Sequence, residues 1–241
     1  MIEALDVLAV FAHPDDAEML AGGSLARSAD RGERVGILDL TRGERGSRGT
    51  PELRETEALA AAKVLGVQVR RNAGFPDAGI DDSYESRRHL AGLIRELRPA
   101  VVVTHWIESR HPDHRATARL VTNAAFLSGL RQLDAPGDPF RPRKVVHATL
   151  FREDAPSPSF VVDVSAQVER KLQALACHAS QFDGARGMGE MFPGGERPFP
   201  EQVVAHLAYW GSRIRVAAGE PFWTRETMMA DTLGSLAVST F

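Results

Sequence analysis

Several features that define other classes of protein are missing from this sequence. Cysteine occurs only once in 241 residues, at position 177, so the chain lacks a disulfide framework and a cysteine-based zinc site. No apolar run approaches the roughly 18 residues of a membrane-spanning helix, and residues 1–6 lack the basic start of a secretory signal. The net charge of −3 does not fit the basic surface of most nucleic-acid-binding domains. We therefore expect a cytoplasmic protein that binds neither nucleic acids nor membranes.

What the sequence does contain is a regular alternation of apolar strands and helices over its first 130 residues. Most of the helices stop at a glycine or just before a proline, which are common end signals. The expected strands are residues 5–12, 33–41, 67–71 and 100–104, and the expected helices are residues 16–31, 50–66, 83–98 and 111–130. Four such alternations predict an α/β fold, namely a Rossmann-like, doubly wound, mostly parallel sheet with helices on both faces.

The pattern is less regular beyond residue 130. Further strands are expected at residues 144–151 and 160–164, then a helix capped by Ser165 and another over residues 201–218. Residues 183–200 are rich in glycine and proline, which is typical of either a mobile lid or a disordered surface loop. A tail of undefined role starts at Phe222. The length fits one domain over residues 1–241, and a domain with an appendage is the alternative.

Two short motifs place histidine and aspartate after the first and fourth expected strands. They read AHPDDAE at residues 12–18 and HPDH at residues 111–114. In the doubly wound order these strands are neighbours, and ligands bind at their carboxyl ends. We therefore expect the motifs to meet, with His13, Asp16 and His114 on one divalent ion. Two imidazoles and one carboxylate leave a coordination position open for water, as in catalytic zinc sites.

The other polar residues of the motifs suit metal-dependent hydrolysis. Asp15 is adjacent to a ligand and is expected to be the general base for the attacking water, with a helix cap as its alternative role. His111 shares a helix face with His114 and could stabilise the oxyanion of a tetrahedral intermediate. Asp113 either orients His111 or caps the helix. Glu18 is expected to be a favourable charge at a helix N-terminus.

Nucleotide binding is the main alternative for a sheet of this kind, and the first turn argues against it. A dinucleotide site needs a glycine-rich turn after the first strand. Here that turn is HPDD, which places negative charge where a phosphate would lie, and Gly22 and Gly23 come too late. The G-x-S-x-G pattern of a serine nucleophile is also missing. Histidines outside the two motifs, such as His105 and His178, are interpreted mainly as structural.

The two motifs resemble those of the LmbE/PIG-L superfamily of zinc-dependent N-acetylglucosaminyl deacetylases. Softer segments are similar to the bacillithiol-biosynthesis branch, whose substrate is N-acetylglucosaminyl malate. These segments are DLTRGE at residues 39–44, RETEA at 54–58, GFPDAGI at 74–80, RHPDH at 110–114, PSFVVD at 158–163 and SQF at 180–182. The resemblance spans about residues 5–182, with a weaker match at residues 218–222. It implies an LmbE-like fold and an enzyme that releases acetate from an amino-sugar conjugate.

The resemblance also implies roles for particular residues. One Zn²⁺ per chain, or Fe²⁺ in vivo, would be bound by His13, Asp16 and His114. Asp15 would be the base that activates the metal-bound water, and His111 its catalytic partner. The residues implied to contact the substrate are Glu44, Arg54, Asp77 and Arg110. The two guanidinium groups suit the carboxylates of malate, and a surface salt bridge is the alternative for each. Family members are often hexamers, so a homo-oligomer is expected.

Two alternatives to the malate conjugate remain open. Residues 104–109 lack a tyrosine that some members place near the metal, and residues 184–195 match no family segment. The enzyme could therefore belong to another branch that acts on other GlcNAc conjugates or on mycothiol conjugates. A non-catalytic sugar- or metal-binding member is the alternative from a different class. The presence of Asp15 beside all three ligands favours an enzyme, because binding alone does not need a base.

Overall fold

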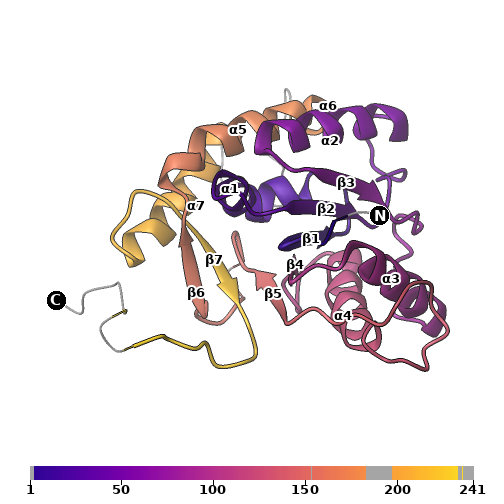
Figure 1. Ribbon diagram of the computed structural model, residues 1–241. Coiled ribbons are helices and arrows are strands. Elements are labelled where there is room, and N and C mark those ends of the chain that lie inside the picture. Colours follow the sequence, from indigo (N-terminus) through magenta and orange to yellow (C-terminus); the bar gives the residue numbers. More distant parts are fainter. Residues whose placement is uncertain (1–2, 153, 183–196, 233–234, 236–241) are drawn as a thin grey trace.

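A seven-stranded sheet runs through the centre of the molecule, with helices on both of its faces (Figure 1). The computed structural model describes residues 3–152, 154–182, 197–232 and 235. In this part of the chain, none of the helices combines the length and the apolar character needed to cross a membrane. The strands are β1 (Val7–Phe11), β2 (Val35–Asp39), β3 (Val69–Asn72), β4 (Val101–His105), β5 (Lys144–Ala148), β6 (Phe160–Asp163) and β7 (Gly219–Trp223). The helices are α1 (Asp16–Asp30), α2 (Pro51–Leu65), α3 (Tyr84–Leu97), α4 (Pro112–Leu127), the 3₁₀ helix η1 (Ser165–Gln167), α5 (Val168–Cys177), α6 (Ala179–Phe182) and α7 (Phe199–Arg213).

The strand order is β3-β2-β1-β4-β5-β7-β6. The pairs β1–β2, β2–β3, β1–β4 and β4–β5 are parallel, and β7 pairs antiparallel with β5 and β6. β1 and β4 are neighbours in the register Val7 to Val101, as the doubly wound order predicts. The predicted class, a Rossmann-like and mostly parallel α/β sheet, is confirmed.

Two hydrophobic cores lie on opposite faces of the sheet. Successive residues of β1 alternate between them, so that Ala9 and Phe11 pack in one core and Leu8 and Val10 in the other. This alternation is the two-residue period of a strand, and it explains why a strand covered on both sides is apolar throughout. Helices α1, α2 and α5 cover the first face, and α3 and α4 cover the second (Figure 1).

The helix boundaries follow local signals in the sequence. Oγ1 of Thr50 accepts a hydrogen bond from the backbone N–H of Leu53 at 3.2 Å, and Pro51 occupies the first helical position. Gly66 ends the same helix in the left-handed conformation, with φ of 78°, which glycine adopts without steric strain. Ser83 caps α3 in the way that Thr50 caps α2. These starts and stops are the predicted ones.

The C-terminal part departs from the prediction. The helix expected over residues 201–218 is α7, which begins earlier and stops at Arg213. The chain then turns back, with the N–H of Val216 bonded to the carbonyl of Gly211 at 2.9 Å, and any side chain at Gly211 would meet the backbone of Ala218. What was expected to be the start of a tail, at Phe222, is part of β7 inside the sheet. Of the loop expected at 183–200, residues 183–196 lie outside the described residues.

Candidate active site

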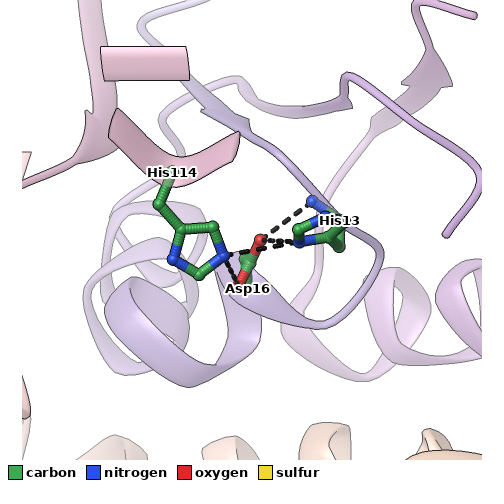
Figure 2. A group of neighbouring side chains, drawn as sticks. All are labelled: His13, Asp16 and His114. Carbon is green, nitrogen blue, oxygen red and sulfur yellow. Dashed lines mark hydrogen bonds and ion pairs between the residues drawn. The ribbon is translucent and has the colours of Figure 1, made fainter. Parts of the chain in front are cut away.

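The two motifs meet at the carboxyl ends of β1 and β4. β1 ends at Phe11 and α1 begins at Asp16, so His13 lies in the turn that connects them. β4 ends at His105 and α4 begins at Pro112, which places His114 on the first turn of that helix. Because β1 and β4 are paired, residues about a hundred positions apart come into contact. Figure 2 shows His13, Asp16 and His114 turned toward one another.

Asp16 lies between the two imidazoles. Its Oδ2 is 3.2 Å from Nδ1 of His13, and its Oδ1 is 3.3 Å from Nε2 of His114. Nε2 of His114 is in turn 3.4 Å from Nδ1 of His13. One ligand atom from each residue lies within 4.8 Å of the others. The structure thus brings the predicted ligand set together.

The second ring nitrogen of His13 faces two further carboxylates. Nε2 is 3.2 Å from Oδ1 of Asp77 and 3.4 Å from Oδ2 of Asp113. Burial acts to lower the pKa of His13, but the carboxylates of Asp113, Asp16 and Asp77 outweigh it and raise the pKa to about 12. A carboxylate behind a metal-binding imidazole fixes the ring and makes it a stronger ligand. This concentration of negative charge suits a cation.

Asp16 is ionised in this environment. Burial acts to raise its pKa, but the imidazoles of His114 and His105 hold the pKa of Asp16 well below its usual range. The ring of His105 stacks on that of His114, with centroids 3.9 Å apart, and its Nε2 accepts a hydrogen bond from the N–H of Ala12 at 3.0 Å. Zn²⁺ and Fe²⁺ both accept imidazole and carboxylate ligands. The donor set of His13, Asp16 and His114 therefore fits a divalent metal ion.

Asp15 has an unusual backbone conformation. Its φ is 120°, a region that residues with side chains rarely adopt and that typically costs about 1–3 kcal/mol. It occupies the N-cap position of α1, yet its carboxylate makes no capping hydrogen bond. The alternative role of Asp15 as a helix cap is thus wrong. Burial raises the pKa of Asp15 to about 6, although Arg54 acts in the opposite direction.

Arg54 contacts Asp15 at the wall of the cleft. Its Nη2 lies 3.3 Å from Oδ2 of Asp15 and donates to the carbonyl of Pro14 at 2.9 Å, while Nη1 donates to the carbonyl of Gly43 at 3.0 Å. Gly43 has φ of 65°, and a Cβ there would lie 2.0 Å from Nη1 of Arg54. The side chain of Arg54 is only 5% exposed. Most of the N–H groups of its guanidinium therefore already have acceptors within the protein.

His111 is the N-cap of α4, and its Nδ1 accepts a hydrogen bond from the N–H of Asp113 at 3.2 Å. Burial, together with His114 and His13, lowers the pKa of His111. The neutral ring therefore carries its proton on Nε2. The carboxylate of Asp113 accepts from the N–H of Ala78 at 2.7 Å and lies 3.4 Å from Nε2 of His13. The helix-cap interpretation of Asp113 is wrong, because His111 is the N-cap residue. Asp113 holds the ring of His111 through its backbone N–H and not through its carboxylate.

The remaining predicted substrate residues lie around the same site. Oε1 of Glu44 accepts from the N–H of Asp77 at 2.8 Å, and Oδ2 of Asp77 accepts from the N–H of Arg45 at 2.8 Å. These bonds tie the loop after β2 to the loop after β3, with Asp77 pointing at His13. Arg110 is exposed beside His111. Contact of Glu44, Asp77 and Arg110 with a substrate stays a prediction.

A cleft of about 620 Å³ opens over the cluster, a volume within the range of small-molecule sites. Asp15, His111 and the three metal-ligand candidates face it together with Arg54, Asp77 and Arg110. Its outer walls come from residues 45–47 and from Gln181 and Phe182 of α6. Most of the lining side chains are polar or charged, so the cleft suits a hydrophilic ligand.

A buried charge network behind Asp15 was missed from the sequence. Glu18 forms an ion pair with Arg70, whose Nε also lies 2.8 Å from Oδ2 of Asp39. Nε2 of His178 lies 3.4 Å from Oε1 of Glu18, and both side chains are fully buried. Glu18 is therefore more than a charge at a helix terminus. Arg70 and His178 are 52 and 160 positions away from Glu18, so no local pattern in the sequence connects them. The segment that contains His178 does precede the SQF stretch noted above.

Comparison with known proteins supports the resemblance seen in the motifs. The family model described as GlcNAc-PI de-N-acetylase (PIG-L) matches residues 8–125. The chain is 30% identical to a probable N-acetyl-alpha-D-glucosaminyl L-malate deacetylase 2 of Bacillus anthracis, over 90% of this chain and 93% of that protein. It is 33% identical to a 1D-myo-inositol 2-acetamido-2-deoxy-alpha-D-glucopyranoside deacetylase 2 of Catenulispora acidiphila, over 91% and 93% of the two chains.

Solved structures share the fold. The conserved protein TT1542 from Thermus thermophilus superposes with a TM-score of 0.83 at 41% identity, covering 94% of this chain and 97% of that one. These similarities confirm the LmbE-like architecture that the motifs implied.

Proposed function

Because the chain belongs to the PIG-L family of GlcNAc-PI de-N-acetylases, we propose that its substrate is N-acetylglucosaminyl L-malate and that its metal is Zn²⁺. The broader activity follows from the family: the protein is a hydrolase that removes the acetyl group from a GlcNAc conjugate. The finer proposal concerns the group attached to the sugar, the identity of the ion and the roles of individual residues.

One observation carries the catalytic proposal. Asp15 is held in a strained conformation, faces the cleft and makes no capping hydrogen bond, while Asp16 beside it lies between His13 and His114. The two adjacent aspartates thus have separate roles: Asp16 would bind the ion, and Asp15 faces the substrate. A protein that only binds a metal or a sugar has no need for this second carboxylate. The arrangement therefore favours an enzyme over a non-catalytic binding protein.

Each residue of the site has a separate role in hydrolysis. A divalent ion on His13, Asp16 and His114 would supply Lewis-acid polarisation and lower the pKa of a water molecule. Asp15 would accept a proton from the attacking water, because a carboxyl group with a pKa of about 6 is mostly ionised at neutral pH. The same group then returns the proton to the departing amine. Acetate and the free amino sugar are the two products.

The other residues hold the reacting groups in place. Arg54 fixes Asp15 through an ion pair and two backbone carbonyls. The Nε2 proton of His111 faces the site and is available to a developing oxyanion, since its Nδ1 is engaged by the helix. Asp77 and Asp113 orient His13 from behind.

Positive charge at the cleft supports an anionic group on the sugar. Arg45 and Arg110 face the cleft, and among the described residues neither guanidinium has a hydrogen-bonding or ionic partner. Arg152 lines the same cleft and pairs with Asp154 near the surface. Unpaired guanidinium groups are suited to bind carboxylates in a bidentate manner. Malate carries such carboxylates, whereas the inositol conjugate of the second relative is neutral at the corresponding position.

A comparison of substrates tests this proposal. Acetate release should be measured by the zinc-loaded enzyme on N-acetylglucosaminyl malate, on the inositol conjugate and on N-acetylglucosamine. We expect the highest kcat/KM for the malate conjugate. A preference for the inositol conjugate would assign the chain to another branch of the family. Turnover of none of the three would refute the proposed substrate class.

A further inference from the structure

A second cavity adjoins the proposed metal site and the polar cleft. It has a volume of about 260 Å³ and shares Asp16, Ser109, Arg110, His114 and Arg152 with the larger cleft. The two spaces therefore meet at two of the three metal-ligand candidates. His105, stacked on His114, also borders this second cavity.

Apolar side chains gather on one side of the second cavity. The larger cleft has polar side chains such as Arg45, Ser47 and Gln181. The second cavity has an apolar side, which is made by Leu20, Trp106, Ala148, Leu150 and Phe151, and a charged side with Arg110, Arg152 and Asp154. The apolar side comes from Leu20 of α1, from Ala148 at the end of β5 and from residues that directly follow β4 and β5. Sugar hydroxyl groups need polar partners, whereas methylene groups gain from apolar burial.

The scissile amide has two arms that diverge from one carbonyl group, a sugar on the nitrogen and an alkyl group on the carbon. When the carbonyl lies at the metal site, one arm must enter each space. We propose that the second cavity receives the acyl arm and that the enzyme hydrolyses N-acyl groups longer than acetyl. This proposal rests on the proposed function of the site as a GlcNAc-conjugate deacetylase.

The size of the cavity exceeds what an acetyl group needs. A water molecule, which is close in size to a methyl group, occupies about 30 Å³ in the liquid. The cavity of about 260 Å³ is several times larger, so it has room for a linear chain such as butyryl or hexanoyl. The reaction needs only water: the C–N bond breaks, hydroxide adds to the acyl carbon and the proton goes to the amine. The products are a longer carboxylate and the free amino sugar.

A series of acyl chains provides the first test. The zinc-loaded enzyme should be assayed on N-acetyl-, N-propionyl-, N-butyryl- and N-hexanoylglucosamine and on the same series of glucosaminyl malates. Each buried methylene contributes about 0.8 kcal/mol, or roughly fourfold in kcat/KM. We expect kcat/KM for the butyryl amide to equal or exceed that for the acetyl amide. A butyryl value below half of the acetyl value overturns the proposal.

Two variants that fill the cavity test whether it determines the dependence of kcat/KM on acyl length. Ala148→Leu narrows it from β5, and Leu20→Phe narrows it from α1, so that one variant remains informative if the other folds poorly. Each should lower the hexanoyl-to-acetyl ratio of kcat/KM at least tenfold. Ala60→Leu, the same change on the exposed face of α2, is the matched control and should leave the ratio unaltered. An unaltered ratio in folded Ala148→Leu and Leu20→Phe overturns the proposal.

Binding of the carboxylate products gives a readout that does not depend on turnover. Hexanoate should raise the melting temperature of the zinc-loaded protein more than acetate at equal concentration, and Ala148→Leu should remove that difference. Equal shifts for the two carboxylates in the unaltered protein overturn the proposal. Cleavage of the acetyl amide without cleavage of longer ones would refute this proposal and leave the proposed function intact. Failure to cleave any amide, acetyl included, would overturn both.

Discussion

Nη2 of Arg54 lies 3.3 Å from Oδ2 of Asp15, and the same nitrogen donates to the carbonyl of Pro14. The motif resemblance suggested that Arg54 binds a carboxylate of the substrate. In the structure its guanidinium instead spans Pro14, Asp15 and Gly43, which leaves little of it for a ligand. Arg54 is therefore better placed to position Asp15, the proposed base, and Arg110 is better placed to contact an anionic substrate.

This difference predicts separate effects of the two arginines. Losing a charge-assisted hydrogen bond costs about 1.5–3 kcal/mol, which corresponds to roughly ten- to hundredfold in rate. Arg54→Ala should lower kcat/KM by that order on both N-acetylglucosaminyl malate and neutral N-acetylglucosamine. Arg110→Ala should do so only on the malate conjugate. Steady-state kinetics on the two substrates distinguish these outcomes, and equal losses in Arg110→Ala would count against the malate conjugate.

Asp15→Asn should keep the metal and lose rate. The ligand atoms of Asp16, His13 and His114 are untouched, but an amide cannot accept the proton from water. General-base contributions are about 10²–10⁴-fold, so kcat should fall by that order while the zinc content measured by mass spectrometry stays at one per chain. Asp16→Asn is the matched control and should lose zinc. Normal turnover in Asp15→Asn would show that Asp15 is not the base.

His114→Ala should abolish stoichiometric zinc binding and nearly all turnover. Removing one of three protein ligands leaves an incomplete site, and Asp16 loses the imidazole at 3.3 Å from its carboxylate. His89→Ala serves as the control, because His89 is exposed and its ring lies against the carbonyl of Ala73 and the ring of Phe75, outside the predicted ligand set. Full zinc occupancy in His114→Ala would rule out the assigned ligand set.

The sequence was informative wherever the signal was local or followed from strand order. His13 and His114 follow expected strands that are neighbours in the doubly wound order. Because ligands bind at the carboxyl ends of such strands, the sequence was enough to predict that these two residues meet. The helix ends at Thr50 and Gly66 needed only the chemistry of caps.

Other features depend on tertiary contacts that no local sequence pattern predicts. Pro221 argues against a strand, because proline cannot donate to a sheet, yet β7 fits between β5 and β6 with that residue opposite Val161. The contact of the Asp113 carboxylate with His13 depends on how the loop that contains Ala78 packs. A side chain only one residue from a ligand can face either way, and spacing alone does not decide which.

A buried ion pair joins α5 to β7, and its carboxylate also bonds to α1, the helix that carries Asp16. Nζ of Lys171 lies 2.6 Å from Oε1 of Glu220, and both side chains are fully buried. Glu220 also accepts hydrogen bonds from the N–H groups of Gly23 and Ser24 in α1 at 2.9 and 2.7 Å. A Cβ at Gly23 would lie 3.0 Å from Glu220 and 2.9 Å from Val164, so glycine permits this close approach.

Lys171→Met should destabilise the protein by about 3–5 kcal/mol, because it leaves the Glu220 carboxylate buried without its partner. The double variant Lys171→Met/Glu220→Gln should recover part of that loss, since it removes the unpaired charge and keeps an acceptor for α1. Arg170→Ala is a neighbouring control: Arg170 pairs with Asp30 at the surface, where such pairs contribute about 0–1 kcal/mol. Urea unfolding of the four proteins provides the comparison, and equal losses in Lys171→Met and Arg170→Ala would contradict it.

His178 should make the stability of the fold depend on pH. Burial acts to lower its pKa, but the carboxylates of Glu18 and Asp15 outweigh burial and raise the pKa of His178 above its ordinary value. The native state therefore keeps a proton that the unfolded chain releases near pH 6.5. Its contribution is fully present below about pH 6.5 and is lost as the pH rises through the raised native pKa.

The free energy of unfolding of the zinc-loaded protein and of His178→Gln should be compared at about pH 6 and about pH 9. We expect the variant to be less stable than the unaltered protein at the lower pH and the difference to shrink at the higher pH. The comparison between proteins removes the contribution of every other titrating group that both share. In a Glu18→Gln background, the difference should lose most of its pH dependence, because the carboxylate that holds the proton is gone. A difference that is the same at both pH values with Glu18 present would show that the native state does not raise the pKa of His178.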